Sequence, residues 1–168
     1  FNIEKGSLMN IFYLDTSPKE AAMMHCDKHC VKMILETAQL LCTAHRELDG
    51  DYWSDEVGLY KSTHKNHPSA VWVRESSEHY WWALGLFVYL CKEYTSRYGK
   101  SHKSAELMQL LCIAPMNIEE IGFTDPPQCM PDEYKCENAV EAYRSYYLGE
   151  KMGFAKWNYS PTPEWTYA

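Results

Sequence analysis

The stretch that decides the fold runs from Cys26 to Thr43 and reads Cys-Asp-Lys-His-Cys-Val-Lys-Met-Ile-Leu-Glu-Thr-Ala-Gln-Leu-Leu-Cys-Thr. On a helix that turns by about 100° per residue, one row of polar side chains shares an arc of about 80°. That row consists of His25, His29, Lys32, Glu36, Gln39 and Thr43. From Cys30 to Ala44 the remaining positions are apolar except for Thr37. A helix with so wide an apolar face is buried, so we predict the central helix of an all-α domain.

Ionisable groups inside such a helix have to be paired or functional, because burying an unpaired charge is costly. One interpretation is an internal salt bridge between Lys32 and Glu36, which stand four residues apart. The other is a catalytic site. A carboxyl in a partly dry site has a raised pKa and a nearby amine a lowered one. Such a pair suits acid–base chemistry or a Schiff base with an aldehyde or sugar.

Composition narrows the class of protein. The 168 residues are 46% apolar and suit one domain with a real core. A net charge of −7 argues against a generic basic nucleic-acid binder. With 6 Trp, 13 Tyr and 5 Phe, either the core is aromatic or some rings face a planar ligand. Seven cysteines without a paired framework or signal peptide indicate a reducing cytosol, and no apolar run of about 20 residues suggests a membrane span.

The rest of the chain contains further sequence signals for the start and end of helices. Ser17-Pro18 starts a helix that we expect to reach about Arg46, with a possible break near Asp27. Further helices are expected over 70–98, ended by Gly99, and over 104–112 and 136–148, followed by an irregular aromatic tail. Residues 1–8 are interpreted as an extension before a start at Met9, and residues 9–168 as a single helical domain.

Histidines suggest a metal site as an alternative. His25 and His29 are spaced to bind one ion, and His67 is a possible third ligand, with Glu36 nearby on the central helix. The spacing lacks the glutamate of the usual zinc-protease motif. This interpretation predicts bound Zn or Fe and a metal-dependent hydrolase; the main interpretation needs no cofactor.

Two further segments have both a binding and a structural interpretation. Arg144 stands among tyrosines and is followed by Lys156 and Trp157, a mixture that holds phosphates and stacks bases, or that packs as an aromatic terminus with cation–π pairs. Asn66-His67-Pro68 is either part of a site or a helix cap followed by proline.

Three segments together resemble a known group of proteins. In order, they are Lys32–Leu40, Asn66–Trp72 and Leu90–Arg97. They are similar to segments of small phage and bacterial proteins of unassigned function, which are related to the pyrimidine-dimer DNA glycosylases of the phage endonuclease V-like group. A weaker similarity continues through Tyr143-Arg144-Ser145 and the aromatic tail. The resemblance covers about Met9 to Tyr167.

The resemblance implies an all-α fold around a catalytic helix, with a glutamate at the position of Glu36. In that group the N-terminal α-amine attacks the sugar C1′ and forms an imine that leads to strand cleavage. Eight residues precede Met9 here, so Lys32 or an activated water would have to replace that amine. The acidic net charge also departs from the group's basic groove, which makes a free nucleotide as good a substrate as duplex DNA.

The resulting hypothesis is a cytoplasmic DNA glycosylase/lyase-like enzyme, of the host-cell cytoplasm if phage-encoded, acting in DNA repair on a nucleobase–sugar bond in DNA or a nucleotide. Glu36 is the expected catalytic carboxylate, Lys32 its partner or the nucleophile, and His29 and His67 the proton-handling groups. The expected substrate-binding residues are Asn66, His25, Gln39, Arg144, Lys156 and Trp157. The alternatives are the metal-dependent hydrolase and a non-enzymatic nucleotide-binding phage protein.

Overall fold

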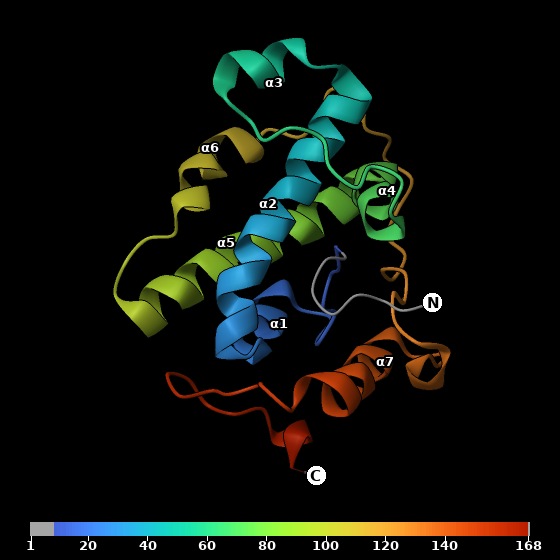
Figure 1. Cartoon of the computed structure of the whole chain (residues 1–168). Coiled ribbons are helices and arrows are strands. Elements are labelled where there is room, and N and C mark those ends of the chain that lie inside the picture. Colours follow the sequence, from blue (N-terminus) through green and yellow to red (C-terminus); the bar gives the residue numbers. More distant parts are fainter. Residues whose placement is uncertain (1–8, 168) are drawn as a thin grey trace.

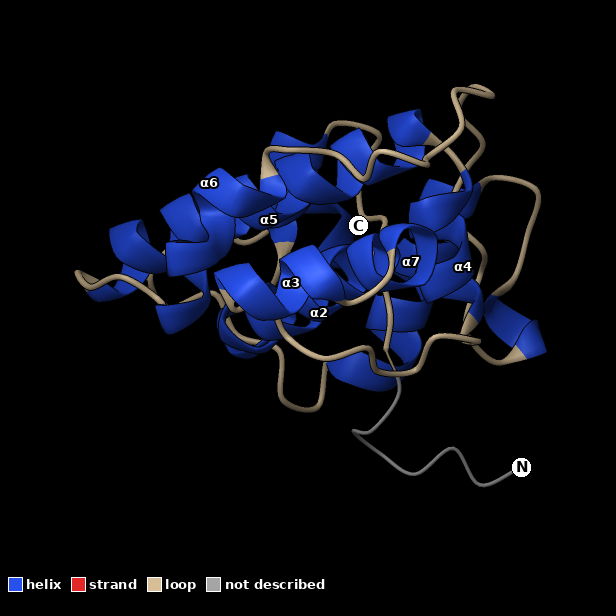
Figure 2. Ribbon diagram, turned by 90° about the horizontal axis from the view of Figure 1, so that it is seen from above, coloured by secondary structure: helices blue, strands red, loops and turns tan. Residues whose placement is uncertain are grey.

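The sequence from Asp27 to Asp49 forms α2, a 23-residue helix that runs through the middle of the computed structural model (Figure 1). The structure describes residues 9–167, so the extension predicted for residues 1–8 lies outside the described residues. Within 9–167 the regular elements are helices and helical turns, and Figure 2 shows no strand. The predicted all-α class is confirmed.

The chain enters α2 through a sharp break. The first helix, α1, covers Pro18–Met24 and begins as predicted, with the Ser17 hydroxyl accepting a hydrogen bond from the N–H of Glu20. His25 and Cys26 are extended, and they separate α1 from α2. His25 therefore does not continue the polar row along α2.

Helix α5, Ser77–Tyr98, crosses α2 and also packs against α1 and against α4, Pro68–Glu75 (Figure 1). The continuous helix predicted over 70–98 is wrong, because Ser76 is extended and divides it. The Ser76 hydroxyl donates to the carbonyl of Gly122 at 2.6 Å, an alternative to helical pairing that serine side chains often use. Gly99 ends α5 with a left-handed φ of 69°, as predicted.

The remaining elements are short. They are α3 (Tyr52–Val57), η1 (Lys103–Leu107), α6 (Met108–Leu111), η2 (Asp132–Tyr134), α7 (Ala139–Tyr146), the π-helical turn η3 (Tyr147–Lys151) and η4 (Glu164–Thr166). The helix expected over 104–112 is a 3-10 turn followed by one α-helical turn. Helix α7 starts later than predicted because Asn138 caps it by accepting from the N–H of Glu141.

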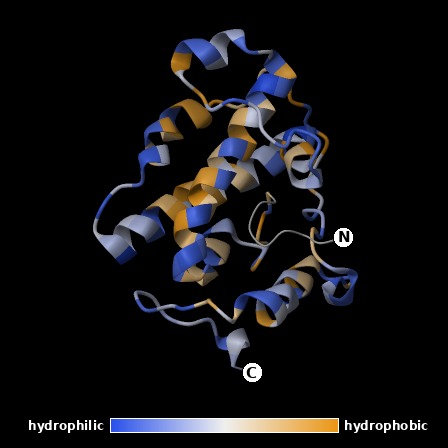
Figure 3. Cartoon of the chain, viewed as in Figure 1, coloured by the Kyte–Doolittle hydropathy of each residue, from blue (hydrophilic) through white to orange (hydrophobic). Residues whose placement is uncertain are grey.

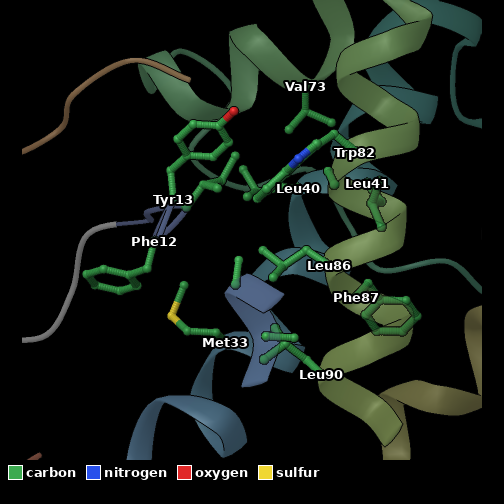
Figure 4. Packing of buried hydrophobic residues seen from close by; sticks show 14 of the residues in the cluster. Phe12, Tyr13, Met33, Leu40, Leu41, Val73, Trp82, Leu86, Phe87 and Leu90 are labelled. Carbon is green, nitrogen blue, oxygen red and sulfur yellow. The ribbon is translucent and has the colours of Figure 1, made fainter. Parts of the chain in front are cut away.

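The core lies between α2, α5 and the buried extended segment 9–14. Figure 3 shows hydrophobic residues concentrated along the two central helices and hydrophilic residues towards the periphery. In the close view of Figure 4, Phe12 and Tyr13 lie on the left near Met33 of α2, and Leu86 and Phe87 of α5 lie to their right. Several of these side chains are fully buried, which supplies the main stabilising free energy of the domain.

Two further properties concern the cysteines and the hydropathy of the helices. All seven cysteines are free thiols, and four of them are buried. Among residues 9–167, none of the helices combines the length and apolar character that crossing a membrane requires.

Candidate functional site

The break before α2 is held by α5 and by the C-terminal segment of the chain. The Asp27 N–H donates to the carbonyl of Lys156 at 2.8 Å, and its carboxylate accepts from the N–H of Asn158 at 2.8 Å. Arg97 on α5 contacts the same carboxylate at 3.2 Å and donates to the carbonyl of His25 at 2.7 Å. These contacts fix the N-terminal end of α2 against the C-terminal segment.

One tyrosine hydroxyl connects α2 with the π-helical turn η3. Tyr147 is fully buried, and its hydroxyl lies 2.7 Å from His29 Nδ1 and accepts from the N–H of Cys26 at 3.1 Å. The His29 ring stacks on Phe12 with centroids 4.5 Å apart. π-Helical turns inside helices occur frequently at functional sites, and this one faces the polar row of α2.

Glu36 lies on α2 and is partly buried. Burial raises the pKa of its carboxyl to about 7, although the charges of Lys32 and Lys151 favour ionisation. A carboxyl that is close to half-protonated at neutral pH can both donate and accept a proton. Such a pKa in a cluster of charged groups is a recognised sign of a functional site.

The charges of two lysines, Lys32 and Lys151, act on this carboxyl. The positive charges of Lys28, Lys32 and Lys151 all act on His29, so the three ammonium groups share one region. Lys28 Nζ lies 4.7 Å from the centroid of the Phe154 ring, and Lys28 and Lys32 are exposed. An acidic protein thus carries a local positive surface beside Glu36.

Lys151 was missed by the sequence analysis. It is partly buried on η3, and its Nζ lies 4.8 Å from the centroid of the Tyr146 ring and 6.0 Å from that of Phe12. Burial lowers the pKa of its amine. The sequence signal that could have found it is its position five residues after Tyr146, on a continuation of the helix that we expected to end at residue 148.

The two histidines beside the break do not fit the proton-handling role predicted for His29. Burial lowers the pKa of His29 to about 2 and that of His25 to about 4. His25 also donates from Nδ1 to the carbonyl of Ala21 at 2.6 Å and is completely buried, so it is not placed to bind substrate. Both imidazoles stay neutral at physiological pH, and His29 positions Tyr147 and Phe12.

His67 and Asn66 belong to the start of α4 and the loop before it. His67 is the N-cap of α4, and its Nδ1 accepts from the N–H of Ser69 at 3.1 Å, which confirms the cap interpretation. Asn66 is exposed in the preceding loop. Within residues 9–167, no hydrogen bond or ring contact links either residue to Glu36, so the structure does not support their predicted roles in catalysis and substrate binding.

The alternative metal site is not formed. His25 and His29 lie on opposite sides of the helix break, and His67 caps another helix. In the part of the chain that the structure describes, no three His, Cys, Asp or Glu side chains converge in a way that could hold a metal ion. The hydrolase that depended on this histidine set is not supported.

The predicted binding residues of the C-terminal region have structural contacts. Arg144 donates to the carbonyl of Leu14 at 2.8 Å and lies over the Trp165 ring at 5.6 Å, so its guanidinium is not available as the expected phosphate ligand. Trp157 is buried and donates to the carbonyl of Met24 at 3.0 Å. Lys156 is exposed, and Gln39 is partly buried one turn after Glu36.

Two open cavities lie elsewhere on the protein. One, of about 550 Å³, is lined by Tyr13, Thr16, Asp125, Cys136, Glu137, Asn138, Val140 and Glu141. The other, of about 310 Å³, is lined by Arg46, Glu47, Asp51, Asp55, Lys61, Ser62 and Lys65. Glu36 is not among the residues that line either of these two cavities.

No protein-family model, curated protein or solved structure matches this chain.

Proposed function

We propose that this protein is an enzyme that cleaves a nucleobase–sugar bond in DNA, with Glu36 as the catalytic carboxylate. The observation that carries the proposal is the pKa of Glu36, which burial raises to about 7 in the middle of a lysine cluster. Cleavage of a glycosidic bond proceeds through a transition state with positive charge on the sugar, and it needs a carboxyl group that stabilises this charge or donates a proton to the leaving group.

The lysines suit the phosphates of the substrate. Lys28 and Lys32 are exposed on successive turns of α2, and Lys28 lies over the partly buried Phe154 ring. Phosphate contacts from lysine position a nucleic acid on a protein without reading its sequence. The local cluster supplies this attraction although the whole chain has a net charge of −7.

Base release from duplex DNA tests the proposal. We would use ultraviolet-irradiated duplexes, which contain pyrimidine dimers, and compare the wild type with Glu36→Gln. Loss of a catalytic acid or base lowers the rate by about 100-fold or more. Glu56→Gln is the matched control, because Glu56 is exposed on α3, outside the lysine cluster.

The outcomes separate the functional classes. Base release that disappears in Glu36→Gln and persists in Glu56→Gln supports the enzyme. Full activity of Glu36→Gln would remove Glu36 from the mechanism. Tight binding of the irradiated DNA without any turnover would replace the enzyme with a non-enzymatic nucleic-acid-binding protein.

A further inference from the structure

Four large apolar side chains are exposed near the end of α2. They are Trp53 on α3, Trp81 on α5, and Ile113 and Met116 in the loop that follows α6. Their exposed fractions are 36%, 45%, 56% and 91%, respectively. We call these four residues the apolar patch. Exposed apolar side chains are ordinary when they are scattered singly, whereas a group of them marks a site of interaction.

Two buried side chains, His45 and Tyr80, connect the members of the apolar patch. His45 Nε2 lies 2.9 Å from the Tyr80 hydroxyl. The centroid of the Trp53 ring lies 5.2 Å from that of His45, and the centroid of the Trp81 ring lies 5.4 Å from that of Tyr80. The Tyr80 hydroxyl also lies 3.4 Å from the carbonyl oxygen of Ile113. The exposed side chains therefore gather around one buried pair.

The loop that carries Met116 is fixed to the end of α2. The Asp49 carboxylate accepts hydrogen bonds from the N–H groups of Met116 and Asn117, at 2.7 Å and 3.0 Å, and from the side-chain amide of Asn117 at 2.8 Å. Asp49 stands one turn after His45 on α2. These contacts hold Met116 in place although its side chain is almost fully exposed. Methionine is favoured at surfaces that bind partner proteins, because its flexible side chain adapts to them.

Carboxylates predominate in the segments that carry the apolar patch. Residues 47–56 contain five of them and no lysine or arginine, and residues 113–123 contain two, again without a basic residue. Salt bridges with Arg46, Lys61 and Lys65 involve only three of these seven carboxylates. The surroundings of the apolar patch are therefore negative, and complementary charge favours a partner that carries positive groups beside an apolar surface.

We propose that the apolar patch is a docking surface for a basic amphipathic helix of another protein. The apolar face of such a helix covers the two tryptophans and the two aliphatic side chains, and the lysines or arginines beside that face meet the carboxylates. Tryptophan is among the residues that contribute most to the free energy of binding at protein interfaces. The inference uses none of the residues assigned to the proposed reaction, so it is independent of that function.

Binding of synthetic peptides to the whole chain tests the proposal. The probe is a peptide with leucine at positions i, i+3, i+4 and i+7 and lysine elsewhere, which forms a helix with one apolar face. One control peptide has glutamate in place of lysine, and a second has the composition of the probe in an order that forms no apolar face. Fluorescence anisotropy of a dye on each peptide measures its affinity. We expect binding of the probe alone, and an affinity that falls as the salt concentration rises.

Two variants of the protein locate the bound peptide. Trp53→Ala should weaken binding of the probe by about 30-fold and Met116→Ser by about 10-fold. Met116→Ser removes a side chain that is 91% exposed, so it tests the surface without disturbing the fold. The matched control is Tyr159→Ser, because Tyr159 is 60% exposed and packs against Tyr98 at the other end of α5. Unfolding midpoints of all three variants show whether they fold.

Each result either supports the docking surface or overturns it. Selective binding of the probe that weakens in Met116→Ser and persists in Tyr159→Ser supports it. Failure of the probe to bind, or equal binding of the lysine and glutamate peptides, would overturn the proposed partner. Equal affinities of Met116→Ser and Tyr159→Ser would place the peptide elsewhere on the protein. A wild-type dimer in sedimentation that Met116→Ser dissociates would make the apolar patch an interface between two copies of this chain instead.

Discussion

Arg97 and Glu36 are both charged groups placed beside or on α2, yet their surroundings differ completely. Arg97 donates to the carbonyls of His25 and Met23 and pairs with Asp27 and Glu93, all at 2.7–3.2 Å. Glu36 has nearby charges but a pKa that burial has raised to about 7. A buried charge with a complete set of partners stabilises a fold, whereas one whose cost is left uncompensated is available for chemistry.

Arg46, at the other end of α2, repeats the pattern of Arg97. Its guanidinium donates to the carbonyls of Tyr60 and Leu59 and contacts the carboxylates of Asp51 and Asp55. It joins α2 to α3 and to the loop that follows. Two arginines therefore fix the two ends of the central helix, and the uncompensated carboxyl lies between them.

The largest effect is expected from removing a fully partnered charge. Arg97→Met should lower the free energy of unfolding by about 3–5 kcal/mol, because Asp27 and two carbonyls lose their partner in a buried place. Urea titration measures it. Lys61→Met, which removes a mostly exposed ion pair with Asp55, should leave the midpoint nearly unchanged. If the two variants lowered the free energy of unfolding equally, a buried arginine with all its partners would contribute no more to stability than an exposed ion pair.

Glu36→Gln should act in the opposite direction on stability. The folded-state pKa of about 7 exceeds the ordinary glutamate value of 4.5, so the unfolded chain releases this proton first and stability falls as pH rises from about 4.5 to about 7. Because solvent screens part of the cost, we expect the glutamine variant to be more stable than the wild type by about 2 kcal/mol at pH 8. The gain should vanish below pH 4.5.

Urea titrations at pH 4 and pH 8 measure that difference, with Glu56→Gln as the control. A variant that is less stable than the wild type at pH 8 would show that Glu36 has a stabilising partner. It would then belong with Arg97 among the structural charges.

The contrast between these charges also explains which features of the fold and the site can be predicted from the sequence alone. Local signals were sufficient for the central helix, for the Ser17 cap of α1 and for the Gly99 end of α5. Each depends on residues within a few positions of one another. Glu36 was found in the same way, because its apolar neighbours along α2 predict burial.

Local patterns could at most extend the last predicted helix to Lys151, and they do not give the orientation of its side chain. Its orientation depends on Tyr147 meeting His29, 118 residues earlier, and on Tyr134 covering Gly149. Arg144 was assigned to binding for the corresponding reason, since its partner is the carbonyl of Leu14, 130 residues away. The break at His25 likewise reflects contacts from Arg97 and from residues 156–158. Such long-range partners decide whether a charge is structural.

His29 provides a titration of opposite sign to that of Glu36. Burial lowers its pKa from 6.5 to about 2, so the unfolded chain binds a proton that the folded protein does not, and stability falls as pH decreases below 6.5. His29→Gln keeps an acceptor for Tyr147 and should make this fall shallower by about 1 kcal/mol per pH unit. Urea midpoints between pH 6 and pH 4 measure the slope. An unchanged slope would mean that His29 is protonated in the folded protein and is not the neutral partner of Tyr147.

Gly149→Ala should have the smallest effect on stability. Its Cβ would overlap the Tyr134 ring, which therefore has to swing outward, at a cost of about 1 kcal/mol. Gly153→Ala in the same segment is the matched control, because its Cβ would meet no atom within 4 Å. Thermal unfolding measures the cost, and Tyr134→Ala in the same chain should remove it. Equal unfolding temperatures of Gly149→Ala and Gly153→Ala would show that the Tyr134 ring does not restrain the π-helical turn.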